Sequence, residues 1–532
     1  MVMGAGVVGL PYAFFHAGAW VSCLTLGLAT IVAVITMGYI VEVCGWCEGW
    51  AAESELGEED RCVTVDGDDD SSEDDTPAVE AAARREGRRA GRPVGPHLFK
   101  IEHRTFELTE MCGVFLGIPV PQGSFLRRFC DARGKLPVAR LVMEFLLCCN
   151  IMISCWLYVS IFGSSLSIIV PQPFVADPPD ISKCLSVCNA LEESPCLASA
   201  CEWVNGTTCT KSAELVRYCD ASYSFFSWVF GVVMMMIACL DLSGLSAIQG
   251  CLSCFAFCSL MVMVVTTAIA IVTDTGDDKG WDAIPVTDVR GLGQLITCAV
   301  TSQMSHQGVP TLVVLMRKKH SAKKVFCGAL VYSLSMYVLL CMSTSVFFGP
   351  SISPIITLNW ERYTGGEAAG QGPWWASALS FMVLLFPVVS VSAAFPLQLV
   401  VISEILQKAF GGSSTTPRGA WSTAPLRIIC CFGAVCLAQA LNNVSQIISA
   451  NAAVAIIVAF MLPCVLHLEA RRLSVQKWGK AAAKTPYYTR VVSHRWFVSF
   501  ILLVSCVIEC FAIYQCIHVP DSKPKSLHPK AV

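Results

Sequence analysis

The first residues of the chain, MVMGAGVVGLPYAFFHAGAW, place glycine and proline inside an apolar stretch. Gly4, Gly6, Gly9 and Pro11 all weaken a helix, and backbone groups freed in lipid are costly unless they are buried or line a cavity. Broken helices form the sites of many secondary transporters, because N–H groups at half-helix ends bind a carboxylate and free carbonyls bind cations or an amino group. The alternative is a glycine-rich face that packs closely against another helix.

Ionisable side chains are rare inside membranes and usually functional. The apolar segments contain His16, Glu42, Glu144, His306, Glu404 and Glu509. Glu42 and Glu404 lie near span ends, where we expect them to meet water, and Glu144 lies one helical turn from Arg140, its expected partner. His306, whose ordinary pKa lies near neutrality, is the best single candidate for binding a coupling proton. A buried structural histidine is the alternative.

Long apolar elements must hold these residues. The 532 residues are 54% hydrophobic and 14% charged, against about 25% charged in soluble chains. No Asp, Glu, Lys or Arg occurs from Met1 to Val41, which excludes a soluble start and an ordinary signal peptide. Because a membrane helix needs about 20 apolar residues, we predict an all-α polytopic membrane protein with eleven spans: 1–17, 20–43, 141–170, 223–240, 246–272, 291–316, 325–348, 373–405, 427–441, 446–468 and 496–517.

The basic residues predict the orientation of these spans. With the amino end inside, 28 of the 37 Lys and Arg residues fall in segments that eleven spans place on the inner side. Without the long segment 45–140, the short inner loops still hold 15 against nine outside. The positive-inside rule therefore predicts a cytoplasmic amino end and a lumenal or extracellular carboxyl end.

Six of the 29 cysteines cluster in the loop 171–222, on the predicted outer side: Cys184, Cys188, Cys196, Cys201, Cys209 and Cys219. An even number there predicts a disulfide-braced cap of open connectivity. A metal site is the alternative, but the loop has no His and no CxxC, so we expect none. Asn205 begins a glycosylation sequon. Both features indicate the secretory route and fit a plasma membrane or a vacuolar or lysosomal-type membrane.

The segment 45–138 has a different composition. Residues 53–75 are dominated by Glu and Asp, and 84–92 read RREGRRAGR, which predicts a largely disordered cytoplasmic insert. The alternative is that 84–92 docks to anionic lipid or folds back on the acidic run. Residues 104–117 predict a short helix before the third span. The predicted order is thus helices 1–2 (1–44), the insert (45–138), helix 3 (139–170), the cysteine loop (171–222), helices 4–10 (223–468), a basic cytoplasmic loop (469–495), helix 11 (496–517) and a tail (518–532).

The opening string resembles the first helix of the amino acid/auxin permease family, which reads roughly G-x-G-(I/V)-L-x-(L/I)-P-Y-A-F-x-x-x-G-W. Shorter stretches agree in order and spacing: Thr105–Glu110 before Phe115–Gly117, Trp156–Gly163 around Tyr158, Ser305–Pro310 before Met316–Lys318, Phe395–Gln398, and Leu462–Leu468. The resemblance covers nearly all of the chain except 45–103 and the cysteine loop, and the helix 1 motif is its most specific part.

This resemblance implies the fold of the amino-acid/polyamine/organocation superfamily, with helices 1–5 and 6–10 as an inverted repeat, helices 1 and 6 broken, and helix 11 peripheral. It implies that the substrate carboxylate meets the backbone of helix 1, that the amino group meets helix 6, that a tyrosine of helix 3 closes over the substrate, and that any sodium ion uses hydroxyls of helix 8. Carried over by position, the helix 1 backbone is that of Gly4, Ala5 and Gly6, and the helix 6 residues are Thr301, Ser302 and Ser305. The helix 3 tyrosine is Tyr158, and the helix 8 hydroxyls are those of Ser390 and Ser392. Ordinary helix packing is the alternative for the tyrosine and the serines.

The chain departs from the family pattern in three places. Only Met1–Met3 precede Gly4, so we expect that the first helix has lost its beginning. Ser305 stands where the family often has glycine, and the acidic insert lies outside the family core.

The function that these features predict is secondary active transport of small, neutral amino acids, coupled to protons or sodium, by alternating access. We expect no cofactor beyond the coupling ion, and we expect a small amino acid and the lipid bilayer as partners, with the oligomeric state left open. The alternative is a membrane sensor that binds an amino acid and signals through the insert with little transport. GxSxG, HExxH and GxxxxGK[ST] motifs do not occur, so we expect no enzyme activity, and nothing points to nucleic acid.

Overall fold

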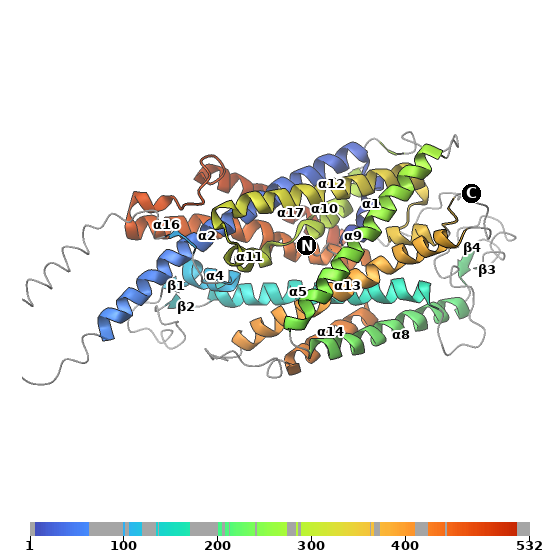
Figure 1. The fold of residues 1–532 in the computed structure, drawn as a ribbon, viewed down its shortest axis with the longest axis horizontal. Helices are drawn as coiled ribbons and strands as arrows, with labels where there is room; N and C mark the ends of the chain where they lie inside the picture. The colour runs from blue at the N-terminus through green and yellow to red at the C-terminus, as the bar shows by residue number, and fades with distance from the viewer. Residues whose placement is uncertain are drawn as a thin grey trace, which may run out of the picture.

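The computed structural model describes residues 6–62, 99–101, 106–119, 135–136, 138–170, 201–204, 208–211, 213–239, 242–273, 284–285, 289–361, 363–365, 373–409, 424–441 and 444–518. Within these ranges the chain is an elongated bundle of long helices (Figure 1). Apolar side chains cover much of its outer surface, such as Ile269 and Leu503, which are 57% and 62% exposed. Such a surface suits contact with lipid tails.

Each of the eleven predicted spans coincides with helical structure. Eight helices of the described residues are long and apolar enough to cross a membrane, and two apolar helices are shorter. The remaining predicted span, 291–316, is an interrupted pair of helices. The elements are α1 (Gly6–Ala17), α2 (Ala19–Cys62), α5 (Val138–Ile169), α8 (Ala213–Ala238), α9 (Leu242–Thr273), α10 (Val289–Gln303) with α11 (Val309–Leu315), α12 (Ala322–Phe348), α13 (Trp374–Ala409), α14 (Ala424–Ala440), α15 (Val444–Ile456) with α16 (Leu462–Trp478), and α17 (Arg495–His518).

The smaller elements lie between these helices. The short helix predicted before the third span is α4 (Leu108–Leu116), closed at its start by a capping box between Glu107 and Glu110. Two antiparallel strand pairs complete the set: β1 (Ile118–Pro119) with β2 (Lys135–Leu136), and β3 (Cys201–Val204) with β4 (Thr208–Lys211). Short 3₁₀ turns are η4 (His306–Gly308), η5 (Lys319–Ser321), η6 (Gly349–Ser351), η7 (Ile356–Trp360) and η10 (Lys480–Ala483).

Helix α2 differs most from the prediction. It was expected to end near residue 43, but it continues to Cys62 and extends out of the bundle (Figure 1). The first part of the predicted insert is therefore helical. The expectation that Glu42 meets water at a span end was wrong, because Glu42 lies in the middle of this helix and is fully buried. By contrast, the expected pair forms: Arg140 Nε lies 2.7 Å from Glu144 Oε1.

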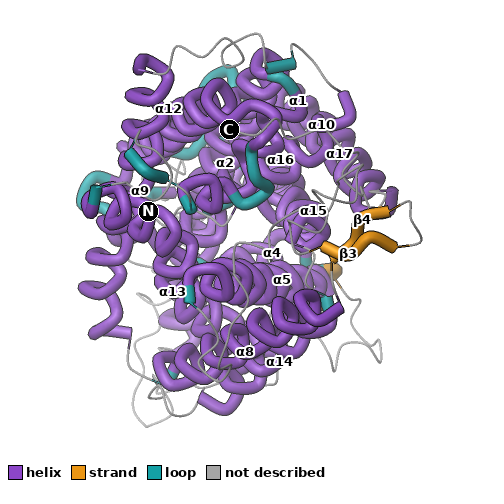
Figure 2. The backbone as a smooth tube through the Cα atoms, turned by 90° about the vertical axis from the view of Figure 1, so that its right-hand side faces the viewer, coloured by secondary structure: helices purple, strands orange, loops and turns teal. Residues whose placement is uncertain are grey.

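The helices form two groups, seen end-on in Figure 2. One group contains α1, α2, α10 and α12, and the other contains α5, α8, α13 and α14, with contacts among the members of each. Helix α15 contacts α10 of the first group and α5 of the second. The space between the groups is therefore bounded by α5, α10, α13 and α15.

Glycines allow the first group to pack closely. A Cβ on Gly291 of α10 would lie 2.5 Å from the carbonyl carbon of His16, so α10 approaches the end of α1 at backbone distance. Gly18 has φ 87°, a left-handed conformation that suits glycine, and turns the chain from α1 into α2. The close contact between α10 and the end of α1 therefore depends on Gly291 having no side chain.

Candidate substrate-binding site

A cavity of about 200 Å³ lies between the two helix groups. It is small beside the roughly 300–1,000 Å³ of pockets for drug-sized ligands, so it suits a molecule of few heavy atoms. Its lining comes from α5, α13, α15 and the interrupted helix α10–α11. The lining residues are Asn150, Ser154, Leu157, Tyr158, Thr301, Met304, Ser305, Gln307, Gly308, Ala394, Leu397, Gln398 and Asn451.

Helix α5 presents a polar stripe to this cavity. Asn150, Ser154 and Tyr158 are spaced four residues apart, which places them on one face of a helix. The side chains of this stripe are buried, so the stripe faces the bundle interior. Asn150 and Tyr158 are 1% and 8% exposed. Buried polar groups in a membrane require partners, which the opposite wall supplies.

The interruption of helix 6 forms the opposite wall. Helix α10 ends at Gln303, and Ser305 has φ −142° and ψ 12°, which is not helical. A single 3₁₀ turn, η4 (His306–Gly308), leads into α11, where Pro310 occupies the first turn. Proline suits this position because its missing N–H is not needed there. The break predicted at Ser305–Pro310 is therefore present, and it frees backbone groups beside the cavity.

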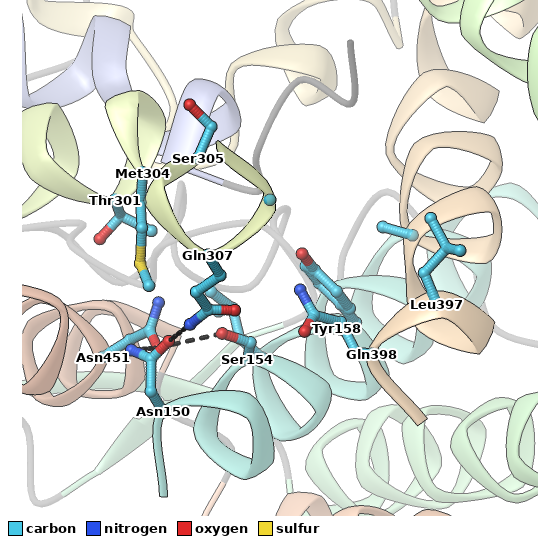
Figure 3. Close-up of a pocket in the computed structure, with 13 residues that line it drawn as sticks. Asn150, Ser154, Tyr158, Thr301, Met304, Ser305, Gln307, Leu397, Gln398 and Asn451 are labelled. Carbon is cyan, nitrogen blue, oxygen red and sulfur yellow. Dashed lines mark hydrogen bonds between the residues drawn. The ribbon is translucent and has the colours of Figure 1, made fainter. Parts of the chain in front are cut away.

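A chain of side-chain amides crosses the floor of the cavity (Figure 3). Gln307 Nε2 donates to Asn150 Oδ1 at 3.0 Å, and Asn150 Nδ2 donates to Asn451 Oδ1 at 3.3 Å. Ser154 Oγ donates to the same Asn451 oxygen at 3.1 Å. This network joins helix 3, the break of helix 6 and helix 10, so it fixes the orientation of each amide.

A second polar pair lies beside the amide network. Tyr158 and Gln398 both line the cavity and lie next to each other in Figure 3. Gln398 follows Pro396, which cannot donate a backbone hydrogen bond to the carbonyl of Ser392 one turn earlier. Helix α13 therefore carries a weakened turn just where it meets the cavity.

The structure places the predicted substrate residues in two locations. Tyr158, Thr301 and Ser305 line the cavity. Gly6 and Ser302 instead meet each other: a Cβ on Gly6 would lie 3.0 Å from the Ser302 nitrogen, and Ser302 Oγ donates to Ala299 O at 2.9 Å. Gly4 and Ala5 lie outside the described residues.

The predicted coupling residues do not line the cavity. His306 is fully buried in η4, and its Nε2 lies 2.8 Å from Thr36 Oγ1 of α2. Its Nδ1 has no hydrogen-bond partner in the described structure. Ser392 Oγ donates to Val388 O of its own helix at 2.7 Å, and Ser390 lies two residues earlier on α13. Ion coupling by these residues stays a prediction.

The predicted outer loop is only partly described. Cys219 is disulfide-bonded, and Cys201 and Cys209 lie on β3 and β4. Cys184, Cys188, Cys196 and Asn205 lie outside the described residues, so the connectivity of the six cysteines and glycosylation at Asn205 stay predictions. No group of three or more His, Cys, Asp or Glu side chains that could hold a metal occurs in the described ranges.

Sequence reasoning missed the amides that dominate the site, namely Asn150, Gln307, Gln398 and Asn451. A signal for them existed, because a carboxamide inside an apolar span is nearly as unusual as a charge. The four-residue spacing of Asn150, Ser154 and Tyr158 marks one face of helix 3 and could have identified the stripe.

The chemistry of the cavity is that of neutral hydrogen bonding. Among the described lining residues, Asn, Gln, Ser, Thr and Tyr supply donors and acceptors, and none of them is Asp, Glu, Lys, Arg or His. Backbone groups freed at the helix 6 break add further donors and acceptors. The fold and this site define a polytopic α-helical membrane protein of the transporter class, with a small polar cavity at a broken helix.

Comparison with known proteins gives the family. The family model for "Transmembrane amino acid transporter protein" matches residues 134–508, well over half of the chain. The chain belongs to this transmembrane amino acid transporter family, as the resemblance predicted. An amino acid substrate and a lipid bilayer are the partners that membership implies.

Individual relatives are more distant. The chain is 23% identical to transmembrane protein 104 of Homo sapiens over 407 residues, which cover 75% of this chain and 70% of that protein. The Pongo abelii protein of the same name gives the same identity and coverage. The transmembrane protein 104 homolog of Drosophila melanogaster is 26% identical over 152 residues, 28% of this chain and 29% of that protein.

Proposed function

We propose that the chain is a secondary active transporter of small, uncharged amino acids with polar side chains. The observation that supports this best is the carboxamide-lined cavity at the break of helix 6, in a member of an amino acid transporter family. A buried site without charged side chains disfavours a substrate of net charge, because an unpaired charge in a dry site is costly. Paired amides instead suit hydroxyl and carboxamide groups.

The proposed orientation follows the predicted roles. The α-carboxylate would meet backbone N–H groups of Gly4, Ala5 and Gly6, and the amino group would meet Thr301 and freed carbonyls near Ser305. The substrate side chain would then face Asn150, Gln398 and their partners. Tyr158 would cover the substrate from helix 3. Transport by alternating access would use a proton or sodium gradient as its driving force.

Uptake into proteoliposomes tests this function. A panel of radiolabelled amino acids is offered to the reconstituted chain with an inward proton gradient, an inward sodium gradient, or neither. We expect concentrative uptake of uncharged polar amino acids under one gradient, and weak uptake of acidic and basic ones. Specific binding without accumulation under any gradient would contradict the carrier and favour the amino acid sensor.

A pair of glutamine variants tests the site. Gln398→Leu removes a cavity amide at similar size. We expect roughly fivefold weaker uptake at low substrate concentration, which corresponds to one hydrogen bond of about 1 kcal/mol. Gln439→Leu is the matched control, because Gln439 lies on α14, which contributes no described residue to the cavity. Equal uptake by the two variants would remove Gln398 from the site.

A further inference from the structure

A buried cluster of charged and titratable side chains lies apart from the cavity. Glu42 of α2 and His467 of α16 have fully buried side chains, and Lys323 of α12 is 24% exposed. Lys323 Nζ lies 2.5 Å from Glu42 Oε1, and His467 Nε2 lies 2.8 Å from Glu42 Oε2. Ser493 Oγ donates to Glu42 Oε1 as well. One carboxylate therefore holds two helices and the chain before α17.

The segment from Gly479 to His494, called here the 479–494 segment, covers this cluster. Tyr39 of α2 donates its hydroxyl to Val492 O at 2.9 Å, and Trp46 Nε1 donates to Ala482 O at 3.0 Å. Arg471 of α16 donates to Ser493 O at 3.3 Å, and Lys323 also donates to Thr489 Oγ1 at 3.1 Å. The cluster thus closes one end of the bundle, the end that the basic residues predict to be cytoplasmic.

One atom of the cluster is left without a partner. The Nδ1 atom of His467 is buried and has no hydrogen bond in the described structure. Glu42 accepts at Oε2, so Nε2 of His467 carries the proton and Nδ1 of the neutral ring presents a free lone pair. A buried ring nitrogen that is unpaired in this way is costly for stability alone. It is, however, ready to accept a proton.

The side chains around Glu42 and His467 favour a change in the partner of Glu42 when His467 binds a proton. The titratable side chains around Glu42 and His467 are Lys323 of α12, Tyr39 of α2, and Cys464 and Arg471 of α16, while the 479–494 segment contributes hydroxyls. Glu48 lies further along α2, near Cys44 and Tyr487. Histidine alone among these titrates near neutral pH in its ordinary state.

We propose that His467 is a proton-binding site that unlocks the predicted cytoplasmic end of the bundle. The proton binds to Nδ1, and the imidazolium keeps its Nε2–H bond to Glu42. The imidazolium then replaces the Lys323 ammonium as the counter-charge of the buried carboxylate. Lys323, the member of the three with access to solvent, keeps its own proton and leaves. The buried charge stays balanced in both states, which avoids the cost of an unpaired buried charge.

The release of Lys323 would act on the cavity through a short connection. Lys323 lies in the first turn of α12, and residues 316–321 join α12 to α11, the half-helix that begins at the break of helix 6. Freeing the start of α12 therefore frees the inner half of helix 6. The coupling of this proton to transport rests on the proposed function, whereas the proton site itself does not.

Hydrogen exchange of the full-length chain in nanodiscs tests the site without any transport. Exchange is measured by mass spectrometry at about pH 7.5 and 5.5 and corrected for intrinsic rates, and peptides covering 479–494 and the start of α12 are compared. Binding of the proton at the lower pH should release Lys323 and expose the backbone of both peptides to exchange. We expect a loss of protection of similar size in both peptides at the lower pH.

The variants separate this site from other histidines. His467→Gln should abolish the pH dependence of exchange, and Glu42→Gln should give low protection at both pH values because Lys323 loses its carboxylate. His494→Gln is the matched control, since His494 is exposed in the same segment, and should behave as the unsubstituted chain. Protection that does not change with pH, or that still titrates in His467→Gln, would overturn the proposal.

Uptake measurements on the same variants address the coupling. His467→Gln should lose the dependence of uptake on a proton gradient, and His494→Gln should keep it. If the unsubstituted chain shows no uptake under any gradient, the proposed function fails, and the exchange experiment still decides whether His467 binds the proton. If uptake by His467→Gln follows the proton gradient as in the unsubstituted chain, His467 does not couple transport.

Discussion

Asn451 offers the sharpest test of the amide network. Its Oδ1 accepts two hydrogen bonds, from Asn150 and from Ser154, and both donors come from α5. Asn451→Ala leaves these donors without a partner in a nearly dry site. Hydrogen bonds between membrane helices are worth about 0.6 kcal/mol on average, so two are worth about 1.2 kcal/mol. At about 1.4 kcal/mol per tenfold, we expect the dissociation constant of the substrate to rise roughly eightfold.

A double-mutant cycle gives this number a second check. Ser154→Ala removes one of the two bonds and should weaken binding about threefold. In Asn451→Ala the bond is already absent, so adding Ser154→Ala should change little further. Ser505→Ala on α17 is the control, because that buried hydroxyl bonds only within its own helix, to Ile501 O at 2.8 Å.

The assay is equilibrium binding of the radiolabelled amino acid to the purified chain in nanodiscs, with thermal unfolding measured in parallel. An Asn451→Ala protein that folds and binds as tightly as the unsubstituted chain would refute the role of the network. Additive losses, near twentyfold for the double variant, would show that Asn451 and Ser154 act independently.

Three further predictions concern packing, accessibility and coupling. Gly291→Ala should lower the free energy of unfolding by about 1–3 kcal/mol, because its Cβ would lie 2.5 Å from the His16 backbone. Gly328→Ala is the control, because a Cβ there meets open space and should be neutral or slightly stabilising. Equal unfolding midpoints for the two variants would contradict this prediction. Burial raises the pKa of the Cys112 thiol to about 12, so the thiol stays neutral below that pH. N-ethylmaleimide at neutral pH should therefore leave Cys112 unmodified in the folded chain and modify it after unfolding, as read by peptide mass spectrometry. His306→Gln keeps a hydrogen-bonding side chain beside Thr36 and should leave the pH dependence of uptake unchanged; a flattened profile would return the coupling proton to His306.

The span architecture was predictable because lipid imposes it. Each crossing needs a long apolar helix, and the eleven segments were recognisable from length and hydropathy alone. The break of helix 6 was predictable too, because Pro310 and Gly308 stand where an unbroken helix would need strong helix formers. The extension of α2 to Cys62 was not predictable from the sequence. It is supported by contacts from distant chain: Trp46 bonds to Ala482, and Gly45 packs against the Phe99 carbonyl, where a Cβ would come within 2.9 Å.

The site was less predictable than the fold, for a related reason. Thr301, Ser305 and Tyr158 were identified through the order of short motifs, which carries information about position in the bundle. Asn150 and Asn451 are 301 residues apart, and nothing local in either segment reports that they meet. Gly6 and Ser302 lie against each other in the described backbone, and their contact with the substrate stays a prediction.

Helix α2 connects the two buried histidines. Thr36 contacts His306 at the break of helix 6, and Glu42 contacts His467 at the closed end. The six-residue step from Thr36 to Glu42 corresponds to about 9 Å along the helix axis. Helix α12 follows α11 after a short turn, and Lys323 at its start contacts Glu42 of α2. Helix α11 therefore lies between two contacts with α2, one through His306 before it and one through Lys323 after it. The Lys323–Glu42 ion pair is therefore one of the contacts that hold the start of α12, and through it the end of α11, against α2. The Thr36–His306 contact and the packing of α11 on α2 do not depend on that ion pair, so the proposed release of Lys323 acts first at the start of α12.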